Sequence, residues 1–304
     1  MNLPTPTAPA VPAPGGRGFA QLVAEAVHIW LANLWPLAVI AALIELPLGL
    51  VSLVPGLAYG AQGPPGLLAP SPSQPLAATP ADTTSTVLLL VTVPVLIGLT
   101  AALEAVLYRA IAEAYTGRRP GLAAAYRAGL GRLRPLLAKE LILVLMLLAL
   151  AFPLGALAAL AGFVLGGAGG LALGTELLVG MLGAVAAWLL VRLALASPAI
   201  VTEGLSGRES LRRSAILTRG RFWRTFSVIV VTALPNLAVG LLAGGLGLLP
   251  GLTGTLIETA VFVVVSAFLA PLPMCATLAV YYEYRRAEAG ALSIGMTAEP
   301  EAGP

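Results

Sequence analysis

The residues of this sequence with the clearest chemical potential are ionisable side chains inside long apolar segments. Glu45 lies near the middle of the first segment, Glu104 near the inner end of the second, and Arg192 in the inner half of the fourth. A charge inside a bilayer costs at least about 2.5 kcal/mol, so each needs a partner or a purpose. Either glutamate could pair with Arg192 and fix helix packing, or the three could line a cavity and form a substrate or proton site.

The sequence offers little material for catalysis. It contains one histidine, His28, and one cysteine, Cys275. A single histidine excludes metal sites built from several histidines and argues against a serine-histidine-aspartate arrangement. The glycines at 166, 167, 169 and 170 lack the glycine-lysine ending of a phosphate loop. We therefore expect no catalytic, cofactor-binding or metal-binding residue, and we predict that the protein is not an enzyme.

Composition indicates an integral membrane protein. Hydrophobic residues make up 58% of the 304 residues and charged residues 10%, and the mean hydropathy is +0.93. A water-soluble domain of this composition would lack the polar surface to cover its core. No stretch between apolar segments much exceeds about 30 residues, whereas an independent domain usually needs about 50. Function must therefore reside in the membrane bundle or in its short loops.

The apolar segments predict an all-α fold, an integral membrane helical bundle of six transmembrane helices with amphipathic interfacial helices. About 20 residues are needed to span a bilayer. The six predicted spans are 33–54, 85–108, 138–162, 176–200, 224–247 and 255–282. We expect disordered tails at 1–18 and 287–304 on either side of a six-span domain at 19–286, with an irregular loop from Pro55 to Thr84.

Basic residues fall almost entirely on one side of these segments. The alternate loops, at 55–83, 163–175 and 248–254, contain no Lys or Arg. By the positive-inside rule, both termini and the basic loops are predicted to lie in the cytoplasm. The preference for Arg over Lys, with abundant Ala, Leu, Gly and Pro, is typical of a GC-rich bacterial genome. The predicted location is therefore a bacterial cytoplasmic (inner) membrane.

An amphipathic segment precedes each pair of spans. The first covers 19–30 and the second 122–137, where Leu122, Tyr126 and Leu130 begin an apolar stripe. The third begins at Ser206, whose spacing to Glu209 fits a capping box. This threefold pattern fits either an internal repeat or a recurrent use of surface helices.

The amphipathic segments carry the candidate contacts of this protein. We expect them to lie in the headgroup plane, with arginines toward anionic phosphates. In the alternative interpretation they only fix topology and helix entry. The candidate lipid or partner contacts are Arg127, Arg132, Arg134, Arg212, Arg213, Arg221, Trp223 and Arg224.

The stretch from Ser197 to Leu205, continued by residues 208–214 and 217–224, resembles a bacterial family of multi-span proteins. That family includes the membrane domain of glycerophosphoryl diester phosphodiesterases. The stretch from Tyr281 to Arg286 is similar to the same family. In the enzymes of this group the membrane domain is joined to a soluble phosphodiesterase barrel. The resemblance implies a membrane domain and supplies no catalytic residue, because this chain ends soon after Arg286.

Two functional hypotheses follow. The first is a non-enzymatic membrane protein whose cytoplasmic basic helices engage anionic lipid, a protein partner or a second copy of the chain. Its net charge of +3 is concentrated at the membrane face, so we expect no nucleic-acid partner. The alternative is a transporter or permease component that uses Glu45, Glu104 and Arg192.

Overall fold

The computed structural model describes residues 17–59, 83–165, 167–247 and 252–297. The predicted tail before Arg17, most of the loop from Pro55 to Thr84 and the last residues of the chain lie outside these ranges.

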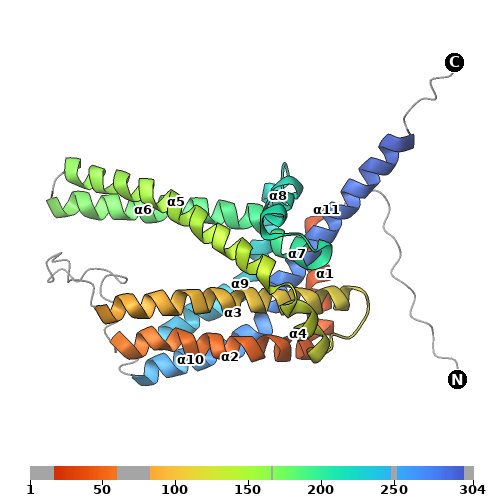
Figure 1. Ribbon diagram of the computed structural model, residues 1–304, viewed down its shortest axis with the longest axis horizontal. Coiled ribbons are helices and arrows are strands. Elements are labelled where there is room, and N and C mark those ends of the chain that lie inside the picture. The colour runs from red at the N-terminus through yellow and green to blue at the C-terminus, as the bar shows by residue number, and fades with distance from the viewer. Residues whose placement is uncertain (1–16, 60–82, 166, 248–251, 298–304) are drawn as a thin grey trace, which may run out of the picture.

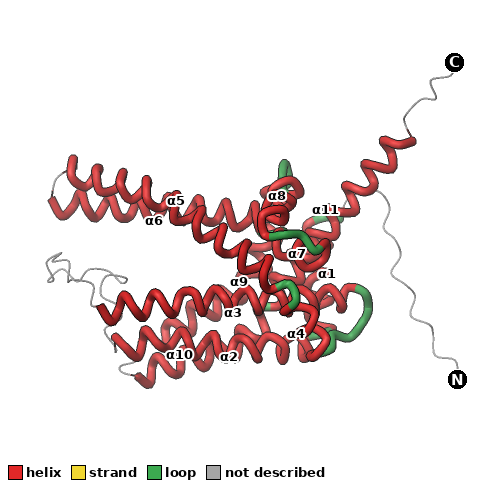
Figure 2. Tube along the Cα trace, viewed as in Figure 1, coloured by secondary structure: helices red, strands yellow, loops and turns green. Residues whose placement is uncertain are grey.

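Helices account for nearly all of the described residues, which contain no strand (Figure 2). Short turns connect several of them at one end of the molecule. The helices are α1 (Phe19–Ala32), α2 (Leu34–Tyr59), α3 (Thr83–Tyr115), α4 (Leu122–Leu130), α5 (Leu133–Leu165), α6 (Gly167–Leu193), α7 (Ala196–Glu203), α8 (Gly207–Leu217), α9 (Phe222–Gly247), α10 (Leu252–Leu269) and α11 (Pro271–Thr297).

Six stretches of the described chain are long and apolar enough to cross a membrane, as the sequence predicts. The sixth is not one straight helix, because α10 ends at Leu269 and α11 begins at Pro271. Proline lacks the N–H that would continue the hydrogen-bond ladder of α10. The predicted tail from residue 287 needs a correction, since α11 stays helical to Thr297.

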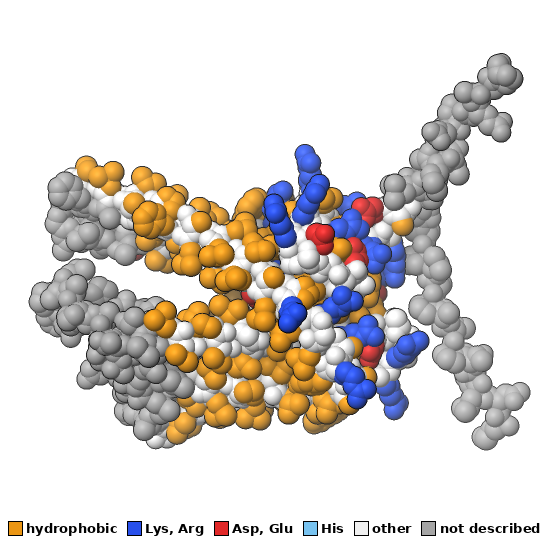
Figure 3. Space-filling view, viewed as in Figure 1, with side chains coloured by type: hydrophobic (Ala, Val, Ile, Leu, Met, Phe, Trp, Pro, Cys, Tyr) orange, Lys and Arg blue, Asp and Glu red, His pale blue; other side chains and the backbone are white. Residues whose placement is uncertain are grey.

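The bundle has two arms that meet at one end (Figure 1). Helices α2, α3 and α10 pack together in one arm, and α5 and α6 form the other. The short helices α1, α4, α7 and α8 gather at the junction with α11. Apolar side chains cover both arms, and the molecule is hollowed between them (Figure 3). The Lys and Arg side chains gather at the junction, which we call the basic end.

The buried core lies mainly at this junction. Leu22, Leu107 and Tyr281 belong to one fully buried cluster, and Leu136 and Ile200 to a second. The arms, by contrast, expose many large apolar side chains along their length. No residue in the most apolar part of the α5 span is buried. Such a surface suits contact with lipid chains and would be costly in water.

The three amphipathic helices turn their buried faces toward protein. On α4 the buried residues are Ala125 and Gly129, while Leu122 and Leu130 of the predicted stripe are exposed. The small face packs against α3. An ideal Cβ on Gly129 would lie only 2.7 Å from Val106 Cα, so a larger residue cannot fit there without moving α4.

Gly129→Ala should therefore destabilise the protein, by about 1–3 kcal/mol for an overpacked contact. Gly98, inside α3, serves as a matched control because a Cβ there would have no neighbouring atom within 4 Å. We expect thermal unfolding in detergent to show a lower midpoint for Gly129→Ala and an unchanged or higher midpoint for Gly98→Ala. Equal midpoints for the two variants would refute the close packing of α4 on α3.

Candidate functional site

Ten exposed arginines form no ion pair with an acidic side chain among the described residues. Five of these ten lie on three segments of the basic end: one on α4, two at or just before the start of α5, and two on α8. We call this set the arginine collar: Arg127, Arg132, Arg134, Arg208 and Arg212. The blue side chains at this end in Figure 3 show how basic groups gather on it. Guanidinium groups that no carboxylate neutralises are free to bind an external anion.

Close backbone packing brings the two halves of the collar together. Gly207, the first residue of α8, lies against α5, because its ideal Cβ would be 2.8 Å from both the backbone nitrogen of Lys139 and the backbone oxygen of Pro135. Gly204 follows α7 with a φ of +74°. Its ideal Cβ would lie 2.9 Å from Arg132 Nη1, so the guanidinium packs over this glycine. The α5 arginines and the α8 arginines therefore share one surface.

A capping box fixes the start of α8, as predicted. The Glu209 amide donates to Ser206 Oγ over 3.4 Å, and the Ser206 amide donates to Glu209 Oε2 over 3.1 Å. The hydrogen bonds from Ser206 lower the pKa of the Glu209 carboxyl. This cap sets the direction of the helix that presents Arg208 and Arg212.

Arg213 differs from the collar arginines. Its guanidinium donates two hydrogen bonds to Glu288 of α11, at 2.9 and 2.6 Å. These hydrogen bonds raise the pKa of Arg213 above its ordinary value. Arg213 is thus half-buried in an internal ion pair that ties α8 to α11, and we do not include it in the lipid-contact set.

Glu203, at the end of α7, is the acidic centre of the junction. Arg213 Nε lies 3.5 Å and Arg285 Nε 3.4 Å from Glu203 Oε1. The Tyr281 hydroxyl also donates to this carboxylate and accepts a hydrogen bond from Thr202 over 3.1 Å. Sequence reasoning missed this role, although Glu203 and Tyr281 both lie in the segments that carry the family resemblance.

The predicted contacts at the start of α9 form a second patch. The Arg221 and Arg224 guanidiniums lie 4.8 and 5.8 Å from the centre of the Tyr284 ring. Trp223 is 74% exposed and stands edge-on to Phe222. An exposed tryptophan beside stacked arginines suits the headgroup layer of a membrane.

A buried lysine organises the intramembrane polar residues. Lys139 Nζ contacts Glu104 Oε2 at 2.7 Å, Ser197 Oγ at 2.8 Å and Glu140 Oε1 at 2.8 Å. Ser197 Oγ donates to the same Glu104 oxygen over 2.6 Å. The partner of Glu104 is therefore Lys139 of α5, and the predicted pairing of Glu104 with Arg192 is wrong.

Arg192 is engaged at the end of α6. Its guanidinium lies 5.1 Å from the centre of the Trp188 ring. Its carbonyl accepts hydrogen bonds from Ser214 over 2.9 Å and Thr218 over 3.1 Å. These bonds attach α8 to α6, so the main contacts of Arg192 are at the junction and not in a central cavity.

Glu45 is 5% exposed and lies on α2, where it contacts Ser266 of α10. It forms no ion pair within the described part of the chain. The structure thus separates the three predicted intramembrane residues. In the described ranges, no group of three or more His, Cys, Asp or Glu side chains could hold a metal ion.

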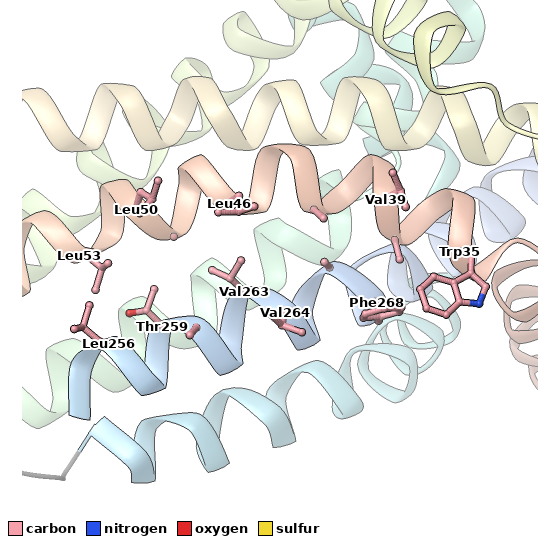
Figure 4. A pocket seen from close by; sticks show the side chains of 15 residues that line it. Trp35, Val39, Leu46, Leu50, Leu53, Leu256, Thr259, Val263, Val264 and Phe268 are labelled. Atoms are coloured by element: carbon pink, nitrogen blue, oxygen red, sulfur yellow. The ribbon is translucent and has the colours of Figure 1, made fainter. Parts of the chain in front are cut away.

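An apolar groove of 460 Å³ runs along the same two helices, α2 and α10 (Figure 4). Trp35 and Phe268 close one end, and Leu53 and Leu256 lie at the other. The groove faces the surroundings of the arm, since Leu50 and Val264 on its walls are about 60% exposed.

Residues 172–297 match the membrane domain of glycerophosphoryl diester phosphodiesterase. The matched range runs from within α6 to the end of α11 and confirms the resemblance seen at 197–224 and 281–286. No curated protein and no solved structure matches the chain. The match concerns the membrane domain alone, and it agrees with the six apolar helices in showing a multi-pass membrane protein.

Removing the buried lysine should weaken the whole junction. Lys139→Met leaves Glu104 and Glu140 without the ammonium group between them, so we expect a loss of roughly 3 kcal/mol in the free energy of unfolding. The double variant Lys139→Met, Glu104→Gln should recover a large part of this loss. Denaturant unfolding in detergent would measure the coupling energy of the two sites.

Arg134→Met on the same helix is the matched control, because Arg134 is exposed. It should change stability by less than about 0.5 kcal/mol. Strictly additive effects at residues 139 and 104 would show that their ion pair does not hold the arms together.

Proposed function

We propose, on the premise that residues 172–297 form a membrane domain, that this is a non-enzymatic protein that binds anionic phospholipid headgroups through its arginine collar. Its location is the bacterial inner membrane, with both termini and the collar on the cytoplasmic side. One observation carries the proposal. The collar places on one surface of a membrane bundle five exposed arginines that form no ion pair with any carboxylate of the described residues.

Charge pairing distinguishes the collar from three other arginines of the basic end. Arg17, Arg213 and Arg285 each meet a glutamate and serve internal contacts. The collar arginines keep their donors free for phosphate, which a guanidinium can bind through two parallel hydrogen bonds. Each exposed basic residue near an anionic surface contributes about 1 kcal/mol of attraction.

The apolar side chains around the collar support a position at the headgroup level. Leu122 and Leu130 of α4 are 45% and 46% exposed and flank Arg127 along the helix. Trp35 and Trp223 are also exposed. Leucines that enter the acyl region, with arginines above them, are typical of interfacial helices. The cytoplasmic side follows from the basic loops, by the positive-inside rule.

The alternative, a transporter or permease component, has less support. It requires Glu45, Glu104 and Arg192 to share a central cavity. Glu104 is bound by Lys139 and Ser197, and Arg192 lies over Trp188. Glu45, on α2, contacts Ser266 of α10 and forms no ion pair among the described residues.

The test is enrichment of anionic lipid around the purified protein. In nanodiscs of phosphatidylcholine with a minor share of phosphatidylglycerol, the wild type should retain phosphatidylglycerol preferentially when its bound lipids are measured by native mass spectrometry. The collar variant carries Arg127→Gln, Arg134→Gln, Arg208→Gln and Arg212→Gln. Its phosphatidylglycerol enrichment should be at least threefold lower than that of the wild type. Raising salt from about 0.1 to about 1 M should also reduce it, because the Debye length falls from about 10 to about 3 Å.

A charge-matched control replaces four exposed arginines outside the collar, Arg118, Arg119, Arg219 and Arg286, with Gln. This variant should keep its enrichment. Equal losses in both variants would mean that net charge alone attracts the lipid, which contradicts a defined site. In a further outcome, a second protein copurifies at fixed stoichiometry with the wild type and is lost only from the collar variant, while lipid retention stays unchanged. That outcome would show that the collar binds a protein partner and not lipid.

A further inference from the structure

We propose that Glu45 is a neutral carboxylic acid that binds a proton in the bilayer interior, and that the groove between α2 and α10 gives access to it from the lipid phase. This site is separate from the arginine collar and does not depend on the function proposed above.

The first argument is burial without a counter-charge. Glu45 is 5% exposed and lies in the span Leu34–Val51. Helices α1, α3, α10 and α11 pack against α2. Their titratable or charged side chains form no hydrogen bond or ion pair with Glu45 among the described residues: Glu25, His28, Glu104, Tyr108, Arg109, Glu113, Tyr115, Glu258, Cys275, Tyr281, Tyr282, Glu283, Tyr284, Arg285, Arg286 and Glu288. An unpaired carboxylate in an apolar medium is costly, so such a group takes up a proton.

The second argument is the close approach of the two helices at this level. An ideal Cβ on Gly49 would lie 2.2 Å from Val263 Cγ2. A larger residue at position 49 would therefore have to displace the Val263 side chain. Glu45 is one turn from Gly49 on α2, and Ser266 is nearly one turn from Val263 on α10. The same approach brings Glu45 onto Ser266.

The third argument is the partner of Glu45. Glu45 is within hydrogen-bond reach of Ser266 of α10, and the Ser266 hydroxyl also donates to the Val263 carbonyl over 3.3 Å. A hydroxyl can donate or accept, so Ser266 can accept a hydrogen bond from a protonated Glu45. Serine carries no charge, so this contact supplies no counter-charge to an ionised Glu45.

Glu104 provides the contrast within the same protein. Its Oε2 receives hydrogen bonds from the Lys139 ammonium group at 2.7 Å and from the Ser197 hydroxyl at 2.6 Å. Both partners donate to Glu104, and one of them carries a positive charge. Glu45, by contrast, has the uncharged Ser266 as its partner among the described residues.

The groove supplies a path to Glu45. Its walls include Ala42, Leu46 and Gly49 of α2, the positions that bracket Glu45 on the helix. On α10 the wall residues Val263 and Ala267 bracket Ser266 in the same way. Figure 4 shows Leu46 and Val263 facing the groove from the two helices. Glu45 and Ser266 are not wall residues themselves, but their neighbours on both helices line the groove. A small apolar molecule in the groove can approach the acid without passing through water.

Dicyclohexylcarbodiimide is the probe that tests this site. It reacts with a protonated carboxyl: the acid proton moves to a carbodiimide nitrogen, the carboxyl oxygen adds to the central carbon, and rearrangement leaves a stable acylurea. In lipid nanodiscs at pH 7.5, peptide mass spectrometry should find at least tenfold more adduct on Glu45 than on Glu104. A water-soluble carbodiimide should leave Glu45 unmodified, and Glu45→Gln should remove the adduct from its peptide.

The pH dependence separates a neutral acid from an ordinary carboxyl. A glutamate with an ordinary solution pKa, near 4.3, becomes tenfold less protonated with each pH unit above that pKa. Its labelling would therefore fall steeply between pH 6 and pH 8. Labelling of Glu45 should stay nearly constant over that interval. A steep fall, equal labelling of Glu104, or absence of the adduct from Glu45 in the folded protein would each overturn the proposal. The collar variant should label like the wild type.

Discussion

The buried ammonium group of Lys139 is the interaction on which the two-armed bundle depends. An ammonium group has three N–H donors, and here each finds an acceptor: Glu104 of α3, Ser197 of α7 and the neighbouring Glu140. Burying a charge is tolerated only when such geometry offsets the loss of solvent. Because α5 and α6 pack little against the other arm along their length, this cluster and the core around Leu136 hold the arms in register.

Around that cluster, acidic groups decide which arginines are structural and which are free. Glu203 and Glu288 neutralise Arg213 and Arg285, and these pairs tie α7 and α8 to α11. The segments that match the membrane domain of the phosphodiesterases contain most of these contacts. Packing at the junction thus accounts for these charged residues of the chain. The collar arginines remain at the surface because no carboxylate of the described chain reaches them.

Two glutamates of the first arm differ in the same way. Glu104 is partly exposed and receives hydrogen bonds from Lys139 and Ser197. Glu45 lies in the adjacent helix, is buried, and contacts the uncharged Ser266. The close approach of α2 and α10 at Gly49 creates the second environment. The exposed apolar side chains of the arms, such as Phe152 at 83%, require lipid around both sites.

The sequence by itself determined the six spans, the basic side of the membrane and the start of α8 at Ser206. Each follows from local facts, namely the length of an apolar run, the composition of the loops and the spacing of a cap. Only the tertiary structure decided that Glu104 pairs with Lys139, that Arg213 is internal, and that α4 packs through Ala125 and Gly129 while its leucines stay exposed. With 17 basic and 14 acidic residues, composition leaves many pairings open. The pairing depends on which side chains meet when helices distant in sequence pack together. Helical periodicity shows which face of a helix is apolar, but not which other helix packs against that face.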